Sequence, residues 1–320
     1  MPRLRRSRPY GPGIRRESRG DTEHFISQDG REITDEATLE RIRSLAIPPA
    51  WTDVWIASDE LGHIQAVGMD QAGRQQYLYH DVWRQQRDRV KFDRALVLAA
   101  ALPTARRSVS RDLNQSGLTE RRALAAAFQL IDRSALRIGS EEYLRRNGSH
   151  GLITLQGRHV IVGAQGVELD FPAKSGKEWH SLVTEPGLTA FLAEMKAKRQ
   201  ARARMLAWRD TSWHALTSTL VNDDIRERTR AELTAKDFRT LRGTIVAAQS
   251  LARSGIPGSD KQAAQAITAA VQATADVLGN TTAVARKSYV DPRLFDQFRA
   301  GRLLDLRRSP EAALRAILEG

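Results

Sequence analysis

The spacing of apolar residues changes once along this chain, and that change restricts the possible folds more than any other feature. Between residues 50 and 80 the apolar residues come in short runs with turns between them, at 54–56, 64–68 and 76–79. From about residue 81 onward they recur mainly at helical spacing. Runs of strands followed by runs of helices indicate an α+β chain. We therefore expect a small β-rich N-terminal domain at residues 21–90, followed by a mainly helical domain with a small antiparallel sheet at residues 91–320.

Residues 1–20 differ from the rest because they are rich in proline, glycine and above all arginine, at positions Arg3, Arg5, Arg6, Arg8, Arg15, Arg16 and Arg19. We expect a disordered basic arm there, which either follows phosphates or only aids solubility. Over the whole chain 50 Lys and Arg exceed 38 Asp and Glu, so the formal net charge is +12. This excess predicts a polyanionic partner, and it favours nucleic acid over a membrane surface.

Composition excludes several functional classes. The chain has no cysteine, which rules out disulfides, thiolate metal sites and a cysteine nucleophile. No His or acidic cluster has metal-ligand spacing and no phosphate-binding glycine loop is present, so we expect neither a metal nor a cofactor. No apolar run has the length of a membrane span or of a signal-peptide core, and we expect a cytoplasmic protein without a membrane partner.

Local signals place the elements of the second domain. A helix from Asp81 is expected to end at Pro103, and residues 151–155 alternate as a strand would. Residues 173–177 have the composition of a hairpin tip, and residues 188–208 are predicted to be helical. Further helix starts are expected at Thr119, Ser140 and Thr234, and the last of these resembles a capping box.

The last predicted strand of the N-terminal domain carries side chains suited to a DNA groove. Tyr77 and Tyr79 share one face of it, Gln76 and Leu78 share the other, and Arg74 precedes them. Glutamine can pair with an adenine edge, and tyrosine can reach a phosphate. A half-buried sheet with tyrosine packing explains the same residues, and both interpretations stay open here.

Candidate reactive residues are scattered along the second domain. They are Arg137 in a tight connection, Lys174 on the hairpin tip, Arg239 early in a helix, Asn280 at a helix start, and Tyr289 about two turns later. A phenol is a poor nucleophile unless cations surround it and stabilise charge in the transition state. Taken singly, each residue also has an ordinary structural explanation, such as packing or ion pairing.

The order of the local sequences resembles the type IB DNA topoisomerases, in particular their compact poxvirus-like and bacterial members. The matching segments are Gly-Arg-Gln-Gln-Tyr-Leu-Tyr at 73–79, Leu-Arg-Ile-Gly at 136–139, Gly-Leu-Ile-Thr-Leu at 151–155, Phe-Pro-Ala-Lys at 171–174, Lys-Asp-Phe-Arg-Thr at 236–240, Leu-Gly-Asn-Thr at 278–281 and Ser-Tyr-Val at 288–290. The resemblance covers roughly residues 25–300, and its specificity lies in the ordered set.

This resemblance implies a clamp around duplex DNA with a tyrosine recombinase-like catalytic domain. Tyr289 would form a 3′-phosphotyrosyl link, Arg137 and Arg239 would hold the nonbridging oxygens, and Lys174 would protonate the 5′-oxygen. Asn280 stands where many relatives have histidine; an amide can donate a hydrogen bond there but cannot titrate near neutral pH.

The expected activity is relaxation of supercoiled DNA by single-strand cleavage, strand rotation and religation, without ATP or metal. We expect a nucleoid-associated monomer. The expected DNA contacts are Arg74, Gln76, Tyr77, Tyr79, Tyr143 and Lys236.

Two other functions remain as alternatives. A tyrosine recombinase or integrase shares this chemistry, but it usually has histidine three residues before the second arginine, where this chain has Lys236, and a helical N-terminal domain. A non-catalytic DNA-binding protein would need only the basic charge.

Overall fold

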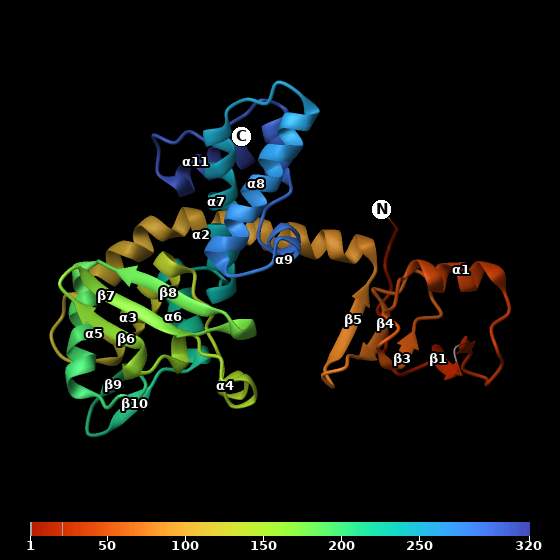
Figure 1. Cartoon of the computed structure of the whole chain (residues 1–320), viewed down its shortest axis with the longest axis horizontal. Helices are drawn as coiled ribbons and strands as arrows, with labels where there is room; N and C mark the ends of the chain where they lie inside the picture. The colour runs from red at the N-terminus through yellow and green to blue at the C-terminus, as the bar shows by residue number, and fades with distance from the viewer. Residues whose placement is uncertain (1, 21) are drawn as a thin grey trace. The chain divides into compact units, whose positions relative to one another are not determined.

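The computed structural model describes residues 2–20 and 22–320, and the chain divides into two compact units (Figure 1). The N-terminal unit ends at Val90, and the C-terminal unit begins at Lys91.

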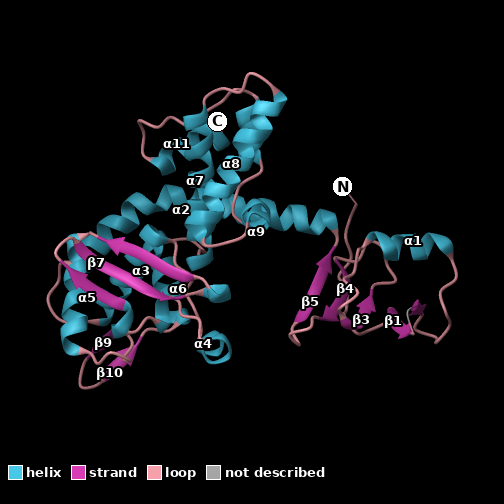
Figure 2. Cartoon of the chain, in the orientation of Figure 1, coloured by secondary structure: helices cyan, strands magenta, loops and turns pink. Residues whose placement is uncertain are grey.

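The N-terminal unit contains a five-stranded antiparallel sheet in the order β2-β1-β3-β4-β5. The strands are β1 (Ile14–Arg19), β2 (Thr22–Ile26), β3 (Thr52–Ile56), β4 (Ile64–Met69) and β5 (Gln75–Tyr79) (Figure 2). Helix α1 (Glu36–Ser44) begins after Asp35, whose side chain accepts a hydrogen bond from the backbone of Thr38. Ile42 of this helix packs with Val54 and Ile56 in the core of the unit.

The basic arm expected at residues 1–20 is not disordered along its whole length, because Ile14–Arg19 is strand β1. Ile14 is buried in the sheet core, and the side chain of Arg16 is only 4% exposed. The Arg16 guanidinium donates to the carbonyl oxygens of Pro48 and Trp51, at 3.2 and 2.6 Å. An arginine can thus bury its apolar stem while its head satisfies buried carbonyls, so arginine density alone does not predict disorder.

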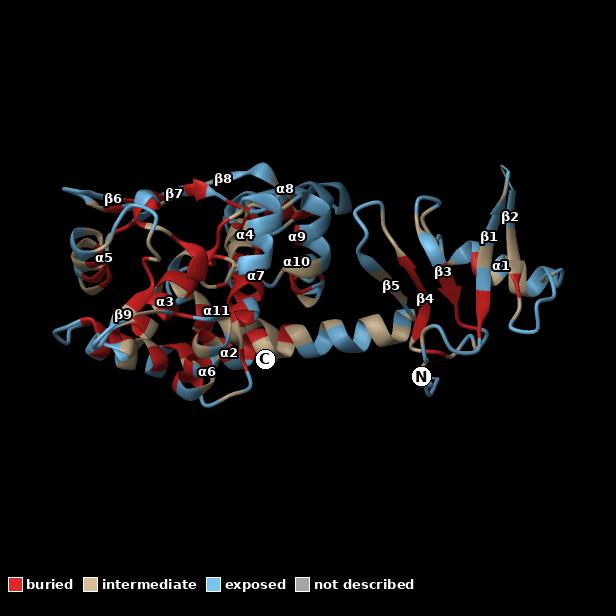
Figure 3. Ribbon diagram, turned by 90° about the horizontal axis from the view of Figure 1, so that it is seen from below, coloured by how far each residue is buried: buried red, intermediate tan, exposed pale blue. Residues whose placement is uncertain are grey.

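The C-terminal unit is mainly helical. Its helices are α2 (Asp81–Leu113), which begins in the N-terminal unit, α3 (Glu120–Ser134), α4 (Glu141–Asn147), α5 (Pro186–Lys198), α6 (Ser218–Thr229), α7 (Ala235–Ser254), α8 (Asp260–Leu278), α9 (Thr282–Ser288), α10 (Arg293–Arg299) and α11 (Pro310–Glu319). Helix α3 packs against α5, α6, α7 and the hairpin strand at 207–209, and much of its surface is buried (Figure 3). Its residues Phe128, Leu130 and Ile131 are almost completely buried. Helices α7 and α8 pack side by side.

A three-stranded antiparallel sheet lies against α5, in the order β6-β7-β8. Its strands are β6 (Val160–Gly163), β7 (Gly166–Pro172) and β8 (Glu178–Val183). The predicted α+β fold is therefore confirmed.

Three local expectations are wrong. Helix α2 continues past Pro103 to Leu113, because Ala105, Val109 and Leu113 bury apolar surface that offsets the hydrogen bond lost at the proline. Residues 152–154 form a short 3₁₀ helix instead of a strand. The helix expected at residues 188–208 ends at Lys198, and it is followed by a hairpin of β9 (Ala207–Arg209) and β10 (Trp213–Ala215).

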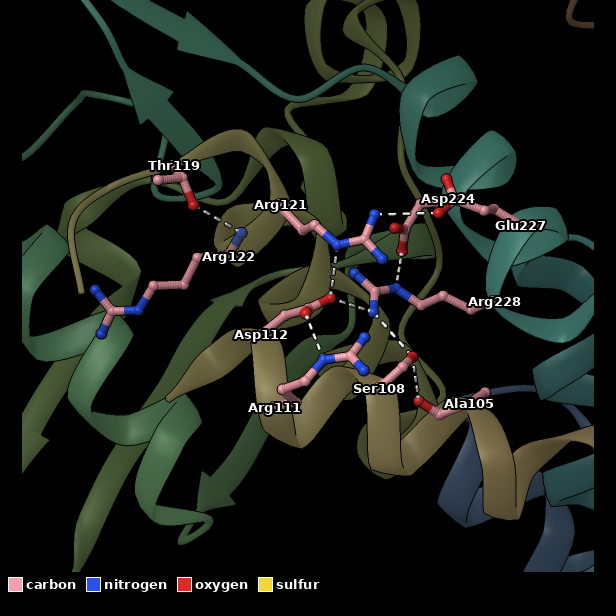
Figure 4. Close-up of polar contacts among 10 residues, drawn as sticks. All are labelled: Ala105, Ser108, Arg111, Asp112, Thr119, Arg121, Arg122, Asp224, Glu227 and Arg228. Carbon is pink, nitrogen blue, oxygen red and sulfur yellow. Dashed lines mark hydrogen bonds and ion pairs between the residues drawn. The ribbon is translucent and has the colours of Figure 1, made fainter. Parts of the chain in front are cut away.

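A buried ionic network joins α2 to α6 (Figure 4). Arg228 donates from Nε to Asp224 Oδ2 and from Nη1 to Asp112 Oδ2, each at 2.7 Å. Arg121 also reaches Asp112 Oδ2, at 3.1 Å. Burial raises the pKa of the Asp224 carboxyl, although its ion pair with Arg228 opposes the rise. The network therefore depends on the Arg228 charge.

Replacing Arg228 by methionine is expected to lower the free energy of unfolding by about 3–5 kcal/mol, because the change leaves two buried carboxylates without their main partner. The matched control is Arg226→Met, which removes the partly exposed Arg226–Asp223 ion pair of the same helix, and its effect should stay within about 0.5 kcal/mol. Urea unfolding of both variants measures the difference. Equal losses would show that the buried network does not contribute more than a surface pair.

Candidate active site

Arg137 lies in the connection between α3 and α4, and local backbone contacts set its position. Ala135 ends α3 in the left-handed conformation, with φ of 51°. The N–H groups of Leu152 and Ile153 then donate to the carbonyl oxygens of Arg137 and Ile138, at 2.9 and 3.0 Å. These bonds require the 3₁₀ turn at residues 152–154, which explains why a strand is not formed there.

Gly151 allows this close contact between the two segments. A Cβ atom on Gly151 would lie 2.7 Å from the carbonyl oxygen of Arg137 and from the Gly139 backbone, which is too close for any side chain. Glycine at this position therefore allows the segment to support the Arg137 backbone.

The half-buried Arg137 side chain donates from Nη2 to Asn280 Oδ1, at 2.5 Å. Burial and the like charge of Arg239 lower the pKa of Arg137 to about 10. The guanidinium remains protonated at neutral pH, so the site keeps its positive charge.

Arg239 lies in the second turn of α7, which begins with the predicted capping box between Thr234 and Asp237. The residue is 3% exposed, and it donates from Nη1 to the Ala135 carbonyl at 2.6 Å and from Nη2 to the Leu278 carbonyl at 2.8 Å. Both carbonyls belong to helix ends, of α3 and α8, where acceptors lack intrahelical partners. Arg239 thus ties together the segments that carry Arg137 and Asn280.

Tyr289 follows α9, and Cζ of Arg239 lies 5.1 Å from the centroid of its ring. Burial opposes ionisation of the half-buried phenol, but the positive charges of Arg239, Arg137 and Lys236 outweigh it. The pKa of Tyr289 is therefore below its usual value. Such a shift makes the phenol a better nucleophile at a given pH.

Asn280 lies between α8 and α9, after Gly279 has ended α8 in the left-handed conformation. Its Oδ1 accepts from Arg137, so Nδ2 is the remaining donor group. Within residues 2–20 and 22–320, Asn280 Nδ2 and Arg239 Nε are buried N–H donors without a hydrogen-bond partner. We call Arg137, Arg239, Asn280 and Tyr289 the tyrosine cluster. It places the Arg239 guanidinium beside a phenol and contains these two buried N–H groups, which have no partner among the described residues.

Lys174 is exposed on the β7–β8 hairpin tip, and its Nζ lies 5.8 Å from the ring centroid of Tyr143 on α4. Lys174 and Arg137 line the same cavity, of about 470 Å³, together with Lys177. Lys177 Nζ donates to the Asn280 carbonyl at 3.4 Å. The cavity therefore has two lysines on one wall and Arg137 on another.

The other expected DNA contacts occupy both units. Tyr143 on α4 is 45% exposed, and Lys236 is exposed in the first turn of α7. In the N-terminal unit, exposure alternates along β5, with Tyr77 and Tyr79 on the exposed face and their rings 6.0 Å apart. Gln76 lies on the opposite face, as its position in the strand predicts.

Asp70 holds Arg74 and Gln76. Arg74 Nη2 lies 2.7 Å from Asp70 Oδ2, and Gln76 Nε2 donates to the same oxygen at 2.9 Å. The Arg74 contacts lower the pKa of Asp70 to about 2. Gln75, which is not among the expected DNA contacts, lies on the exposed face and accepts from the Tyr77 hydroxyl at 2.5 Å. The alternation of side chains along a strand predicts this position, because Gln75 is two residues before Tyr77 and therefore shares its face.

Two buried histidines support the hairpin that carries Lys174. The rings of His150 and His159 are 4.3 Å apart, and His159 packs against Phe171 of β7. Burial, together with the charges of His150 and Arg158, lowers the pKa of His159 to about 4. The ring is therefore neutral in the folded protein at neutral pH.

The His159 pKa predicts acid destabilisation. The folded ring has a pKa of about 4, against about 6.5 for an unfolded histidine. Between these values the unfolded chain binds more protons, so the free energy of unfolding should fall by roughly 3 kcal/mol as pH drops from about 6.5 to 4. Urea unfolding from pH 8 to 4.5 measures the slope. His159→Gln should flatten it and His180→Gln, at an exposed position, should not; equal slopes in all three proteins would contradict the assignment.

No helix in the described part of the chain is both long and apolar enough to cross a membrane. Among the same residues, no group of three or more His, Asp or Glu side chains is placed to hold a metal ion.

Comparisons with known proteins match both parts of the chain. Residues 80–299 match the family model of the eukaryotic DNA topoisomerase I catalytic core, and residues 24–70 match that of the bacterial DNA topoisomerase IB N-terminal domain. DNA topoisomerase 1B of Acanthamoeba polyphaga mimivirus is 30% identical over 285 residues, which are 87% of this chain and 85% of the viral protein. DNA topoisomerase 1B of vaccinia virus (strain Copenhagen) is 22% identical over 284 residues, and DNA topoisomerase I of monkeypox virus is 21% identical over 282, each covering 85% of both chains. These matches agree with the ordered motifs and with the α+β fold, and they show that the chain belongs to the type IB DNA topoisomerases.

Proposed function

We propose that this chain relaxes supercoiled duplex DNA through a covalent phosphotyrosine intermediate. The Tyr289 phenol releases its proton to solvent, attacks one phosphodiester and forms a 3′-phosphotyrosyl bond, while the bond from phosphorus to the 5′-oxygen breaks and that oxygen leaves as a hydroxyl. The duplex then rotates about the intact strand, and the 5′-hydroxyl attacks the phosphotyrosine to restore the DNA. The observation that carries this proposal is the tyrosine cluster, where cations lie close to a phenol of lowered pKa and two buried N–H donors have no partner in the described part of the chain.

Charge stabilisation is the main contribution of the cluster. A phosphodiester carries one negative charge near neutral pH, and its pentacoordinate transition state gathers more charge on the nonbridging oxygens. Arg137 and Arg239 supply that stabilisation from a partly buried site, where electrostatic interactions are stronger than in water. Asn280 adds an amide donor through Nδ2, which does not titrate.

Lys174 is the proposed general acid, because it lines the same cavity as Arg137 and is free to move on an exposed hairpin tip. It transfers a proton to the 5′-oxygen as that oxygen leaves. The same lysine takes the proton back during religation, since the two steps are the reverse of each other.

The reaction needs neither ATP nor a metal in this proposal. The phosphotyrosine bond conserves the free energy of the phosphodiester, and the two guanidiniums stabilise the charge that a metal would otherwise neutralise.

Duplex DNA is the proposed partner of both units. The proposed contacts are Arg74, Gln76, Tyr77, Tyr79, Tyr143 and Lys236. We propose that the enzyme acts as a nucleoid-associated monomer.

Relaxation of plasmid DNA tests the proposal. The protein should relax positive and negative supercoils in EDTA without ATP, and Tyr289→Phe should bind the plasmid but leave it supercoiled. Strict dependence on magnesium or ATP, or relaxation by Tyr289→Phe, would contradict it. Strand exchange between two labelled duplexes would instead indicate a recombinase.

A further inference from the structure

Gly243 and Thr244, on the turn of α7 after Arg239, contact the backbone of Tyr289. Thr244 is 2% exposed, and its Oγ1 lies 3.1 Å from the Tyr289 carbonyl oxygen and 3.2 Å from the Asp291 nitrogen. The hydroxyl accepts from the Asp291 N–H and shares its one proton between the carbonyl oxygens of Tyr289 and Thr240, the second at 3.0 Å. One side chain thus binds the backbone on both sides of Val290.

Gly243 allows α7 to approach this backbone. A Cβ atom at Gly243 would lie 2.6 Å from the Tyr289 carbonyl oxygen and 2.9 Å from Tyr289 Cβ. Glycine is a poor residue for a helix interior, and the contact with Tyr289 gives its presence here a physical reason. Any larger residue would push the nucleophile's backbone away from the helix.

The chain after Tyr289 is held as well. Asp291 is 2% exposed and its Oδ2 lies 2.7 Å from Arg293 Nη2. Arg293 Nη1 in turn lies 2.9 Å from Asp93 Oδ1, on α2. The segment that follows the nucleophile is therefore fixed to the helices of the unit, with Thr244 as its nearest anchor.

We propose that Gly243 and Thr244 are positioning residues that set the distance between the Tyr289 phenol and Arg239. This inference rests on the proposed function. Arg239 and Thr244 are five positions apart on one rigid helix, so anchoring the Tyr289 backbone at Thr244 fixes it relative to the guanidinium. Small displacements of a nucleophile lower the rate of attack strongly.

The chain offers a matched control in Thr274 of α8. Thr274 is fully buried, and its Oγ1 shares its one proton between the carbonyl oxygens of Gly243 and Ala270, at 3.2 and 3.0 Å. Thr274 contacts the turn of α7 that contains Thr244, through the Gly243 carbonyl. It makes no hydrogen bond to the Tyr289 backbone that Thr244 binds. Thr274→Val therefore removes a buried hydroxyl from the α7–α8 contact without removing the anchor.

The test compares Thr244→Val, Thr244→Ser and Thr274→Val on a duplex with which the unaltered protein forms a covalent adduct. Thr244→Val should slow single-turnover adduct formation at saturating DNA by about tenfold to a hundredfold, with the Kd for DNA changed by less than about twofold. Thr244→Ser keeps the hydroxyl and should recover most of the rate. Thr274→Val should keep the rate within about twofold of the unaltered protein. Its thermal midpoint should fall by about as much as that of Thr244→Val, because each variant loses one buried hydroxyl.

The outcomes separate this inference from the proposed function. Equal rates for Thr244→Val and Thr274→Val, or a slow Thr244→Ser, would overturn the positioning role. If Thr244→Val does not fold, Gly243→Ala replaces it and should slow the rate by a similar factor; an unchanged rate would overturn the inference. If the unaltered protein forms no adduct through Tyr289, the proposed function itself fails.

Discussion

Arg239→Ala is expected to slow covalent adduct formation at saturating DNA by at least about a thousandfold. Removing one donor that stabilises transition-state charge typically costs about 10²–10³ in rate, and a guanidinium at a phosphoryl group contributes about 10³–10⁵. The loss of rate in Arg239→Ala should lie at the upper end of these ranges, because the Arg239 guanidinium is 5.1 Å from the Tyr289 ring and also lowers the phenol pKa. Single-turnover rates with the Kd for DNA measured in parallel give the result.

The same substitution has a structural cost that must be separated from the catalytic one. It leaves the buried carbonyls of Ala135 and Leu278 without the Arg239 donor, at about 1–3 kcal/mol each. Rates are therefore compared at a temperature where unfolding experiments show each variant to be folded. Arg242→Ala, on the exposed side of the same helix, is the control and should keep nearly full activity. If a folded Arg239→Ala protein cleaves DNA at a rate within about tenfold of the unaltered protein, Arg239 does not stabilise the transition state.

Lys174→Ala should slow cleavage by about 10²–10⁴, the usual contribution of a general acid. Its diagnostic feature is chemical rescue. If sulfur replaces the 5′-bridging oxygen, the leaving group is a thiolate with a conjugate-acid pKa near 8.5, and it departs without a proton. The variant should then cleave the modified duplex almost as fast as the unaltered protein does, in the same single-turnover assay.

Lys177→Ala is the control for this rescue. Lys177 lines the same cavity, but its Nζ contacts the Asn280 carbonyl. Any loss of rate in this variant should persist on the sulfur-containing duplex, because the loss comes from a disturbed Asn280 segment. Rescue of Lys177→Ala alone would transfer the acid role to Lys177, and failure to rescue either variant would exclude both lysines.

Local patterns predicted those parts of the fold that depend on neighbouring residues. The alternation of β5 and the capping box at the start of α7 both follow from spacing within a few positions. The expectation of a disordered arm fails for residues 14–19, because β1 pairs with β3 and Arg16 contacts the carbonyls of Pro48 and Trp51, all of which lie far away in the sequence. Likewise, only burial after Pro103 explains why α2 continues.

For the candidate site, too, the sequence predicts some features and not others. Ordered motifs identify Arg137, Arg239 and Tyr289, but not how they are held. Arg239 binds carbonyls at the ends of two other helices, and Thr244 binds the backbone of Tyr289, 45 positions later. A threonine and a glycine within a helix have many structural uses, and only the packed structure shows that these two contact the tyrosine.

The central claim is that Arg137 and Arg239 act on one phosphate beside the Tyr289 phenol. The most direct measurement is to trap the covalent adduct on an end-labelled duplex, digest the protein with trypsin and identify the modified peptide. We predict that DNA remains attached through its 3′-phosphate to Tyr289, in the peptide of residues 288–293, and that Arg137→Ala and Arg239→Ala greatly slow its formation. Attachment through a 5′-phosphate, or to any other residue, would contradict the account.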